Sequence, residues 1–333
     1  MELTQMQIFI IVLFIIIFVI GMSGNVYVII INLKPKTEHK TIAIYIINLA
    51  MADIFYISGT PFLAISAYKR NWLFGDVGCR LIYCLDLLTM HSSIYTLVVM
   101  SIERYLAVAH PISAMQYSTS KYARLFCLFI WFFAACSALP MFVYTKQVYE
   151  LYNNGSNTYY CYQEWPMETS YRTYITALFV LDYVLPSIIM FVLYTKLIKI
   201  YWSRVIPSES ENQNLNMSKR KIAKTLFIII VVFWLCYTPF WVFILWHLYS
   251  TSGNFTVAQS YVNVVVICMV YANGCANPFL YTLMTKQASQ IQRNFMKCCT
   301  CNNTPSSNTL EDERDTYICN NDVHTLAANE TNI

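Results

Sequence analysis

One apolar stretch carries two ionisable side chains whose spacing matches a membrane. The segment from Cys79 to Tyr105 is predicted to form one helix, with Asp86 near one end and Arg104 near the other. At about 1.5 Å per residue these side chains are separated by about 27 Å, close to the thickness of a bilayer's hydrocarbon core. Ser93 lies near the same helical face. Charged groups in a membrane are costly, so they normally face protein or water and mark function; a structural acid is the alternative for Asp86.

The composition is that of a membrane protein. Of 333 residues, 57% are hydrophobic and 12% are charged, and the mean hydropathy is +0.46. These values are far from those of a soluble domain and indicate a core that lies in lipid. The net charge is +4, but the sequence has no basic patch with interleaved aromatic residues. We therefore expect no nucleic-acid partner.

Seven apolar segments are long enough to cross a membrane. They cover residues 8–33, 41–67, 77–109, 123–143, 171–203, 219–250 and 258–285. Most of the 22 Lys and Arg residues fall on the side of the membrane where the first span ends. The positive-inside rule makes this the cytoplasmic side and places the N-terminus outside the cell. The expected fold is an all-α, seven-transmembrane helix bundle. Its predicted parts are an extracellular N-terminus (1–7), the seven-span core (8–285), a cytoplasmic amphipathic helix (286–297) and a disordered cytoplasmic tail (298–333).

This sidedness sorts the cysteines and the candidate modification sites. Of twelve Cys, only Cys79 and Cys161 fall at the oxidising outer surface, so we expect a disulfide between them. The predicted outer loops also hold two glycosylation sequons, which begin at Asn154 and Asn254. Three inner cysteines could be palmitoylated or could form a plain cytosolic thiol cluster. They are Cys298, Cys299 and Cys301.

Polar side chains from four spans are predicted to meet near the middle of the membrane. Counted along each helix from its inner end, their depths coincide at about 13–20 Å. They are Asn25, Asp53, Ser93, Asn273 and Asn277. The oxygen atoms of the last four could hold a small hard cation, and we consider an allosteric sodium ion. A hydrogen-bond network without an ion is the alternative, and we expect no other cofactor.

A second acid, Asp182, lies one turn before Pro186 in the outer half of the fifth span. An acid that faces lipid is costly, so we expect it to share a cavity with Asp86. Other residues at a similar depth complete this candidate ligand site: Met90, Tyr237, Phe240, Trp241 and Tyr271, with Tyr83 nearby. Two acids among aromatic rings would suit a cationic, aromatic-bearing ligand, although each ring could equally serve only to pack the bundle.

An ordered set of motifs across the spans resembles the rhodopsin-like G-protein-coupled receptors. The motifs are Gly24-Asn25, Leu49-Ala50-Met51-Ala52-Asp53, Glu103-Arg104-Tyr105, Trp131, Pro186, Pro239 and Asn277-Pro278-Phe279-Leu280-Tyr281. Within that family the chain is most similar to urotensin II receptors. Three stretches carry this closer similarity: Trp72 to Cys79, Leu85 to His91 and Tyr271 to Leu283. Somatostatin and opioid receptors are the next most similar.

The resemblance implies a plasma-membrane receptor that passes the binding of an extracellular cyclic peptide to a heterotrimeric G protein, of the Gq class. It also implies arrestin, receptor kinases and membrane lipid as partners. Asp86 would receive the cation of the peptide and Tyr271 would steady it, since urotensin-type peptides present a Lys beside aromatic rings. The residues implied in G-protein coupling are Glu103, Arg104, Tyr105, Tyr194 and Tyr281.

The chain departs from the family pattern at three positions. Tyr237 stands two residues before Pro239, where the family commonly has Trp. Lys219 stands where some members have an acid that clamps the arginine of the third span, so we expect that contact to be missing here. Asp182 is not part of the urotensin-receptor pattern, and it could shift the ligand preference.

Other functions are less consistent with these residues. A receptor for an amine or for a somatostatin-like or opioid-like peptide is the nearest alternative, because Asp86 would serve an amine as readily as a lysine. A transporter or channel is the alternative from another class. A retinal Schiff base needs a Lys in the seventh span, where this chain has Tyr271. Metal-ligand spacing, an activated nucleophile and a phosphate-binding loop are all missing from the sequence, so we expect no enzyme activity.

Overall fold

A computed structural model describes residues 5–33, 40–110, 114, 119–151, 157–205, 213–250, 259 and 261–279. In these ranges seven helices are long and apolar enough to span a membrane. They are Gln7–Leu33, Thr41–Lys69, Gly75–Ala109, Ser120–Tyr144, Glu168–Ile200, Ile230–Tyr249 and Tyr261–Phe279. The predicted seven-helix bundle is therefore confirmed. The predicted inner amphipathic helix (286–297) and tail (298–333) lie outside the described residues.

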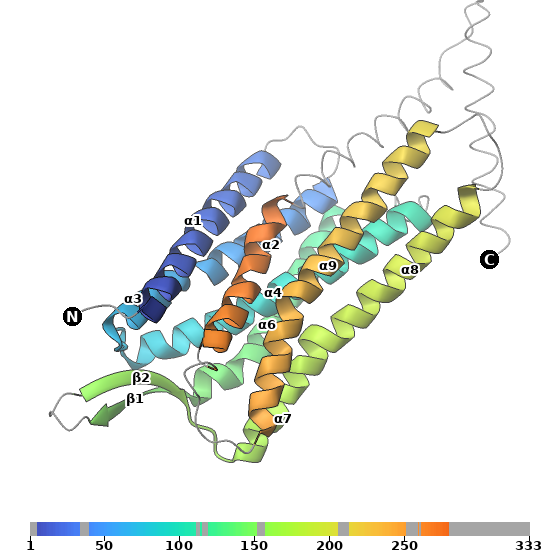
Figure 1. Cartoon of the computed structure of the whole chain (residues 1–333). Helices are drawn as coiled ribbons and strands as arrows, with labels where there is room; N and C mark the ends of the chain where they lie inside the picture. Colours follow the sequence, from blue (N-terminus) through green and yellow to red (C-terminus); the bar gives the residue numbers. More distant parts are fainter. Residues whose placement is uncertain are drawn as a thin grey trace, which may run out of the picture.

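Several of the spans are built from more than one element (Figure 1). The helices are α1 (Gln5–Leu33), α2 (Lys40–Ile57), α3 (Thr60–Lys69), α4 (Gly75–Ala109), α6 (Ser120–Tyr144), α7 (Glu168–Phe179), α8 (Leu185–Val205) and α9 (Gln213–Tyr249). A π-helical turn, η1 (Val180–Val184), joins α7 to α8, and a hairpin is formed by β1 (Thr145–Leu151) and β2 (Asn157–Gln163). The seventh span is the orange helix in Figure 1.

Helix α4, the third span, lies at the centre of the bundle. It packs against α2, α6, α8, η1 and β1. Its buried face continues from Cys79 to Arg104 and includes small and polar side chains as well as apolar ones. A helix surrounded in this way has little surface left for lipid, which explains how it can carry polar groups along its whole length.

The outer helices expose apolar side chains outward. On α1, Ile15, Val19 and Ile30 are each more than half exposed, at 54%, 58% and 52%. In water such a surface would favour aggregation, but in a bilayer it contacts hydrocarbon at no cost. The helices therefore bury only the faces that contact one another.

The second span breaks between α2 and α3. Pro61 lacks an N–H and cannot continue α2, and it falls in the first turn of α3, where that donor is not needed. The Thr60 hydroxyl donates to the carbonyl of Ile57 at 2.8 Å, which satisfies one of the acceptors at the end of α2. The break at Ser58 and Gly59 gives α3 a course of its own at the outer end of the bundle.

The fifth span contains η1 immediately before Pro186. The N–H of Leu185 bonds to the carbonyl of Val180, five residues back, instead of to Leu181, four residues back. Proline supplies no N–H to the carbonyl of Asp182 and its ring would crowd that group, so the wider turn relieves the helix at this point. The consequence is that Asp182 and its neighbours face directions that a regular α-helix would not give them.

The β1–β2 hairpin lies at the end of the bundle where α4 begins and projects beyond the helices there (Figure 1). Its strands are antiparallel, with Thr145 opposite Gln163. Cys161 on β2 is bonded to Cys79 at the start of α4, and their Cα atoms are 5.7 Å apart. The expected disulfide is thus confirmed. The hairpin itself was not predicted, since the sequence analysis assigned no strands to the outer loops.

Loss of this disulfide should release the hairpin from α4. We expect Cys79→Ser to reduce surface expression and to lower stability by about 2–5 kcal/mol, as is typical for a native disulfide. Peptide mapping without reduction should recover Cys79 linked to Cys161 in the wild type. Cys136→Ser removes an exposed free thiol and should behave as wild type in the expression assay; a linkage of Cys84 to either partner would contradict the assignment.

Candidate functional site

Asp86 and Tyr271 form the centre of the candidate ligand site. The Tyr271 hydroxyl donates to Oδ2 of Asp86 at 3.0 Å, and so joins α4 to the seventh span. The Tyr271 ring stacks on Tyr56 with ring centroids 4.1 Å apart, which fixes its direction. Gly59 lies opposite, where a β-carbon would come within 3.3 Å of the second carboxylate oxygen. The missing side chain at Gly59 leaves room for the acid.

The Asp86 carboxylate is half-buried and its charge is not neutralised by this hydrogen bond. No Lys, Arg or His in the described ranges lies within 4 Å of it, whereas the salt bridges that are present involve other acids. A neutral phenol stabilises a carboxylate but leaves its negative charge available. The site is therefore chemically suited to receive a cation.

The other predicted ligand-site residues belong to the same apolar cluster as Tyr271. Met90, Tyr237 and Trp241 are buried, with exposed fractions of 7% or less, and Phe240 packs against them. The rings of Phe240 and Trp241 meet edge to face, with centroids 5.3 Å apart. These residues pack the interior of the bundle, and their contact with a ligand stays a prediction.

Asp182 does not contact Asp86. Its Oδ2 lies 3.2 Å from Nε2 of His91 on α4, and neither side chain is accessible to solvent. The sequence analysis expected both acids in one cavity, and the structure instead gives Asp182 a partner of its own. In the sequence, His91 belongs to one of the stretches similar to urotensin II receptors. The signal that points to the pair is a histidine inside a membrane span, which is rare and usually has a partner.

The mid-membrane polar residues form a network around Asp53. The Ser93 hydroxyl donates to Oδ1 of Asp53 at 2.8 Å, and the Asn277 amide donates to Oδ2 at 2.8 Å. Asn25 donates to the carbonyl of Gly274 at 3.1 Å in the same region. Asn273, by contrast, is within hydrogen-bonding reach of Tyr237. Asp53, Ser93 and Asn277 thus meet as expected, with Asn25 bonded to the carbonyl of Gly274 in the same region, whereas the place of Asn273 in this network stays a prediction.

The network fits a small cation by charge. Asp53 is 1% exposed, and its two hydrogen-bond donors are neutral. No basic side chain in the described part of the chain lies within 4 Å of it. A buried carboxylate in this situation needs a cation or a proton. Asp53 and the hydroxyl of Ser93, with the amide oxygens of Asn277 and Asn273, are the residues that would hold sodium.

This fit can be tested by exchanging sodium for potassium at constant ionic strength. Sodium at ten times its Kd should stabilise the purified receptor by about 1.4 kcal/mol. Asp53→Asn should abolish that response in a thermal unfolding assay. Asp76→Asn removes an exposed acid in the first turn of α4 and should keep the response. An equal response in both variants would show that the salt acts elsewhere.

Arg104 lies near the C-terminal end of α4, which the sequence predicts to be its inner end. It is 5% exposed, and its Nε and one terminal nitrogen have no hydrogen-bond partner among the described residues. Tyr194 on α8 stacks on Phe227 of α9 with centroids 5.1 Å apart, close to the same end of the bundle. Other expected residues lie outside the described ranges. They are Tyr281, Asn154, Asn254, Cys298, Cys299 and Cys301.

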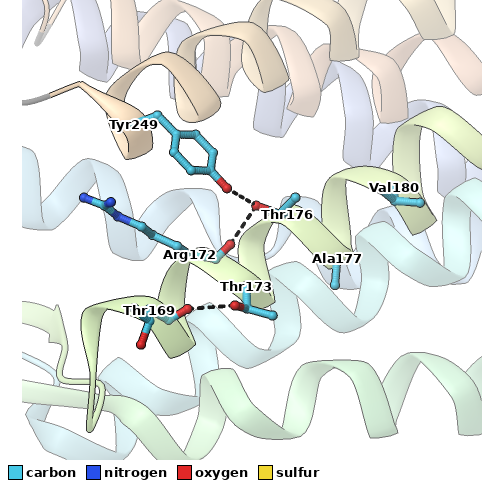
Figure 2. Close-up of a pocket in the computed structure, with 7 residues that line it drawn as sticks. All are labelled: Thr169, Arg172, Thr173, Thr176, Ala177, Val180 and Tyr249. Atoms are coloured by element: carbon cyan, nitrogen blue, oxygen red, sulfur yellow. Dashed lines mark hydrogen bonds between the residues drawn. The ribbon is translucent and has the colours of Figure 1, made fainter.

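A depression between the outer ends of α7 and α9 contains none of the predicted site residues (Figure 2). The hydroxyls of Tyr249 and Thr176 are 2.7 Å apart across it, and Thr176 also donates to the carbonyl of Arg172. The Arg172 guanidinium bonds to Glu168 at 2.6 Å and lies over the Tyr249 ring. Its charge is thus already compensated.

One structural link was missed. The indole N–H of Trp131 donates to the side-chain oxygen of Asn48 at 2.8 Å, and the Asn48 amide donates to Thr96 at 2.9 Å. The chain of three side chains joins α6, α2 and α4. Trp131 had been named only as a motif residue, and a polar Asn in an apolar span was the available signal.

Comparisons with known proteins all match this chain to seven-transmembrane receptors. Residues 24–281 match the model of the family described as 7 transmembrane receptor (rhodopsin family). The chain is 36% identical to the urotensin-2 receptor of Bos taurus over 269 residues, which is 80% of this chain and 68% of that protein. It is 31% identical to somatostatin receptor type 4 of Rattus norvegicus, over 84% of this chain and 71% of that one. Galanin receptor type 1 of Rattus norvegicus is 29% identical over 94% of this chain and 89% of that protein.

Proposed function

Because this chain belongs to the rhodopsin family of seven-transmembrane receptors, we propose that its ligand is a cationic, aromatic-containing cyclic peptide of the urotensin II type. As a member of this family it is a multi-pass plasma-membrane receptor and not an enzyme. We propose further that it signals through a heterotrimeric G protein of the Gq class. The similarity to urotensin-2 receptors supports the choice of ligand and of G protein.

The observation that carries the ligand proposal is the state of the Asp86 carboxylate. It is half-buried, held by Tyr271 and without a cationic neighbour in the described ranges. A lysine ammonium placed there would form a charge-assisted hydrogen bond to the carboxylate and lie beside the stacked rings of Tyr56 and Tyr271. A peptide that carries a lysine between aromatic side chains matches both features.

The route to the inner side is a single helix. Asp86 and Arg104 both belong to α4, which is continuous from Gly75 to Ala109. A ligand that pulls on Asp86 acts on the same rigid element that carries the arginine, and a difference in affinity between two arrangements of the bundle would shift their populations. Glu103, Tyr105, Tyr194 and Tyr281 would rearrange with Arg104 when the G protein binds.

Further features belong to the same proposal. The N-terminus and the hairpin would face outside, with Asn154 and Asn254 as glycosylation sites. Cys298, Cys299 and Cys301 would be palmitoylated at the inner membrane surface, where receptor kinases and arrestin would act. A somatostatin-like peptide is the second candidate ligand, because a somatostatin receptor is also 31% identical to this chain.

Replacement of Asp86 by an amide tests whether ligand affinity depends on the charge of this side chain or only on its shape. Asp86→Asn keeps an acceptor for the Tyr271 hydroxyl but removes the negative charge. We expect about 30-fold or greater loss of affinity for urotensin II, since breaking a buried charge pair costs about 2–5 kcal/mol. An analogue of urotensin II with a neutral residue in place of its lysine should bind the variant and the wild type alike. Equal losses for both peptides in radioligand binding would contradict the anchor role.

A second prediction concerns signalling without ligand. Lys219, Arg220 and Lys221 stand at the inner start of the sixth span, so this segment has no acid to hold Arg104 in the resting arrangement. We expect measurable ligand-free signalling. Lys219→Glu should lower it by up to about fivefold, because a water-exposed ion pair contributes about 0–1 kcal/mol. The measurement is basal second-messenger output at matched surface expression, with Lys219→Gln as the control for loss of the positive charge alone. Basal output equal to that of empty-vector cells would show that other contacts set the resting state.

A further inference from the structure

The His91–Asp182 contact is the one place in the described bundle where a histidine and an acid meet without access to solvent. The distance from Nε2 to Oδ2 is 3.2 Å, and both side chains have exposed fractions of 0%. Neither Nε2 nor the carboxylate oxygens have a well-aligned hydrogen-bond partner among the described residues. The contact is therefore a close pairing of two polar groups that have no other described means of compensation.

The other ring nitrogen of His91 fixes the chemistry of the pair. Nδ1 lies 2.8 Å from the carbonyl oxygen of Leu87, one turn back on α4. A carbonyl can only accept, so Nδ1 carries a hydrogen. In a neutral imidazole Nε2 then has a lone pair, which would face a carboxylate oxygen at 3.2 Å. Two buried acceptors at this distance repel each other unless a hydrogen lies between them.

The described neighbours of Asp182 supply no other counter-charge. Phenols of Tyr95, Tyr174 and Tyr237, from α4, α7 and α9, are close enough to feel its charge. They are neutral groups at physiological pH. An isolated carboxylate among them would cost several kcal/mol, so the hydrogen shared with His91 is what makes the burial tolerable.

The π-helical turn brings these groups together. Because the N–H of Leu185 bonds to Val180, the carbonyl of Leu181 is left without its usual helical donor. The Tyr95 hydroxyl on α4 fills this position at 3.0 Å. On the other side of Asp182, the hydroxyl of Tyr183 is 2.7 Å from that of Thr238 on α9. Three successive residues of η1 are thus each held by a side chain of a neighbouring helix.

We propose that His91 and Asp182 share one hydrogen as a net-neutral pair that positions the π-helical turn against α4, so that Asp86 alone of the two outer-half acids can receive the ligand's cation. Asp182 is then a positioning residue and not a ligand anchor. The part of this proposal that concerns Asp86 rests on the proposed function. The part that concerns the pair does not.

A double-mutant cycle without ligand tests the pair. The variants are His91→Phe, Asp182→Leu and both together, compared by SDS titration of the purified receptor in detergent micelles. Each single change leaves one buried polar partner uncompensated, whereas the double change leaves none. We expect the double variant to be at least tenfold more stable, in unfolding equilibrium constant, than the product of the single effects predicts. If the double variant shows only the product of the two single effects on the unfolding equilibrium constant, the pairing is overturned.

Asp182→Asn supplies the conservative variant. Its amide can donate a hydrogen to Nε2 of a neutral His91, so the pair keeps its shared hydrogen without an acid. We expect this variant to unfold within about threefold of wild type, while Asp182→Leu does not. If the single apolar variants fail to reach the cell surface, recovery of surface expression in the double variant replaces the titration. An Asp182→Asn receptor as unstable as Asp182→Leu would overturn the shared hydrogen.

Ligand selectivity distinguishes a positioning role of Asp182 from a role as ligand anchor. The probes are urotensin II and its analogue with a neutral residue in place of lysine. Asp182→Asn should keep the affinity ratio of the two peptides within about threefold of wild type, whereas Asp86→Asn should bring that ratio close to one. A tenfold or greater fall of the ratio in Asp182→Asn would make Asp182 an anchor and overturn the proposal. If neither peptide binds the wild type, the proposed function fails while the ligand-free cycle still decides the pair.

Discussion

The constraint on which this structure depends is that a polar group inside a bilayer has no water to bind. Backbone groups satisfy it within each helix, and side chains must satisfy it with one another. Three acids in the spans meet this need for a partner in three different ways. Among the described residues, Asp53 accepts from two neutral donors, Asp182 lies against a histidine, and Asp86 accepts from Tyr271. The first two acids have partners within the described bundle, and we propose that the third receives the cation of a ligand.

Helix α4 connects these solutions because it contributes to all of them. It supplies Ser93 to the Asp53 network, His91 to Asp182 and Asp86 to the ligand site, and it ends with Arg104. A movement of α4 relative to its neighbours would change each of these contacts at once. Small displacements at the outer end can in this way be converted into a rearrangement at the inner end, since packed interfaces prefer discrete arrangements.

Breaks in regular helix direct the side chains that matter. The interruption at Gly59 and Pro61 lets the second span pass close to Asp86, and the π-helical turn before Pro186 aims Asp182 toward α4. In both cases a proline removes a backbone donor, and the freed carbonyls or the altered direction are used by neighbouring residues. Local irregularity thus makes specific contacts between spans possible.

The sequence by itself determined the seven spans, the Cys79–Cys161 disulfide and the depth at which Asp53, Ser93 and Asn277 meet. These follow from hydropathy, compartment and helical rise, which depend only on positions along the chain. Only the tertiary structure decided that Asp182 contacts His91. The direction in which the Asp182 side chain points depends on the π-helical turn and on the packing of neighbouring spans. A sequence pattern that assumes a regular helix contains neither piece of information.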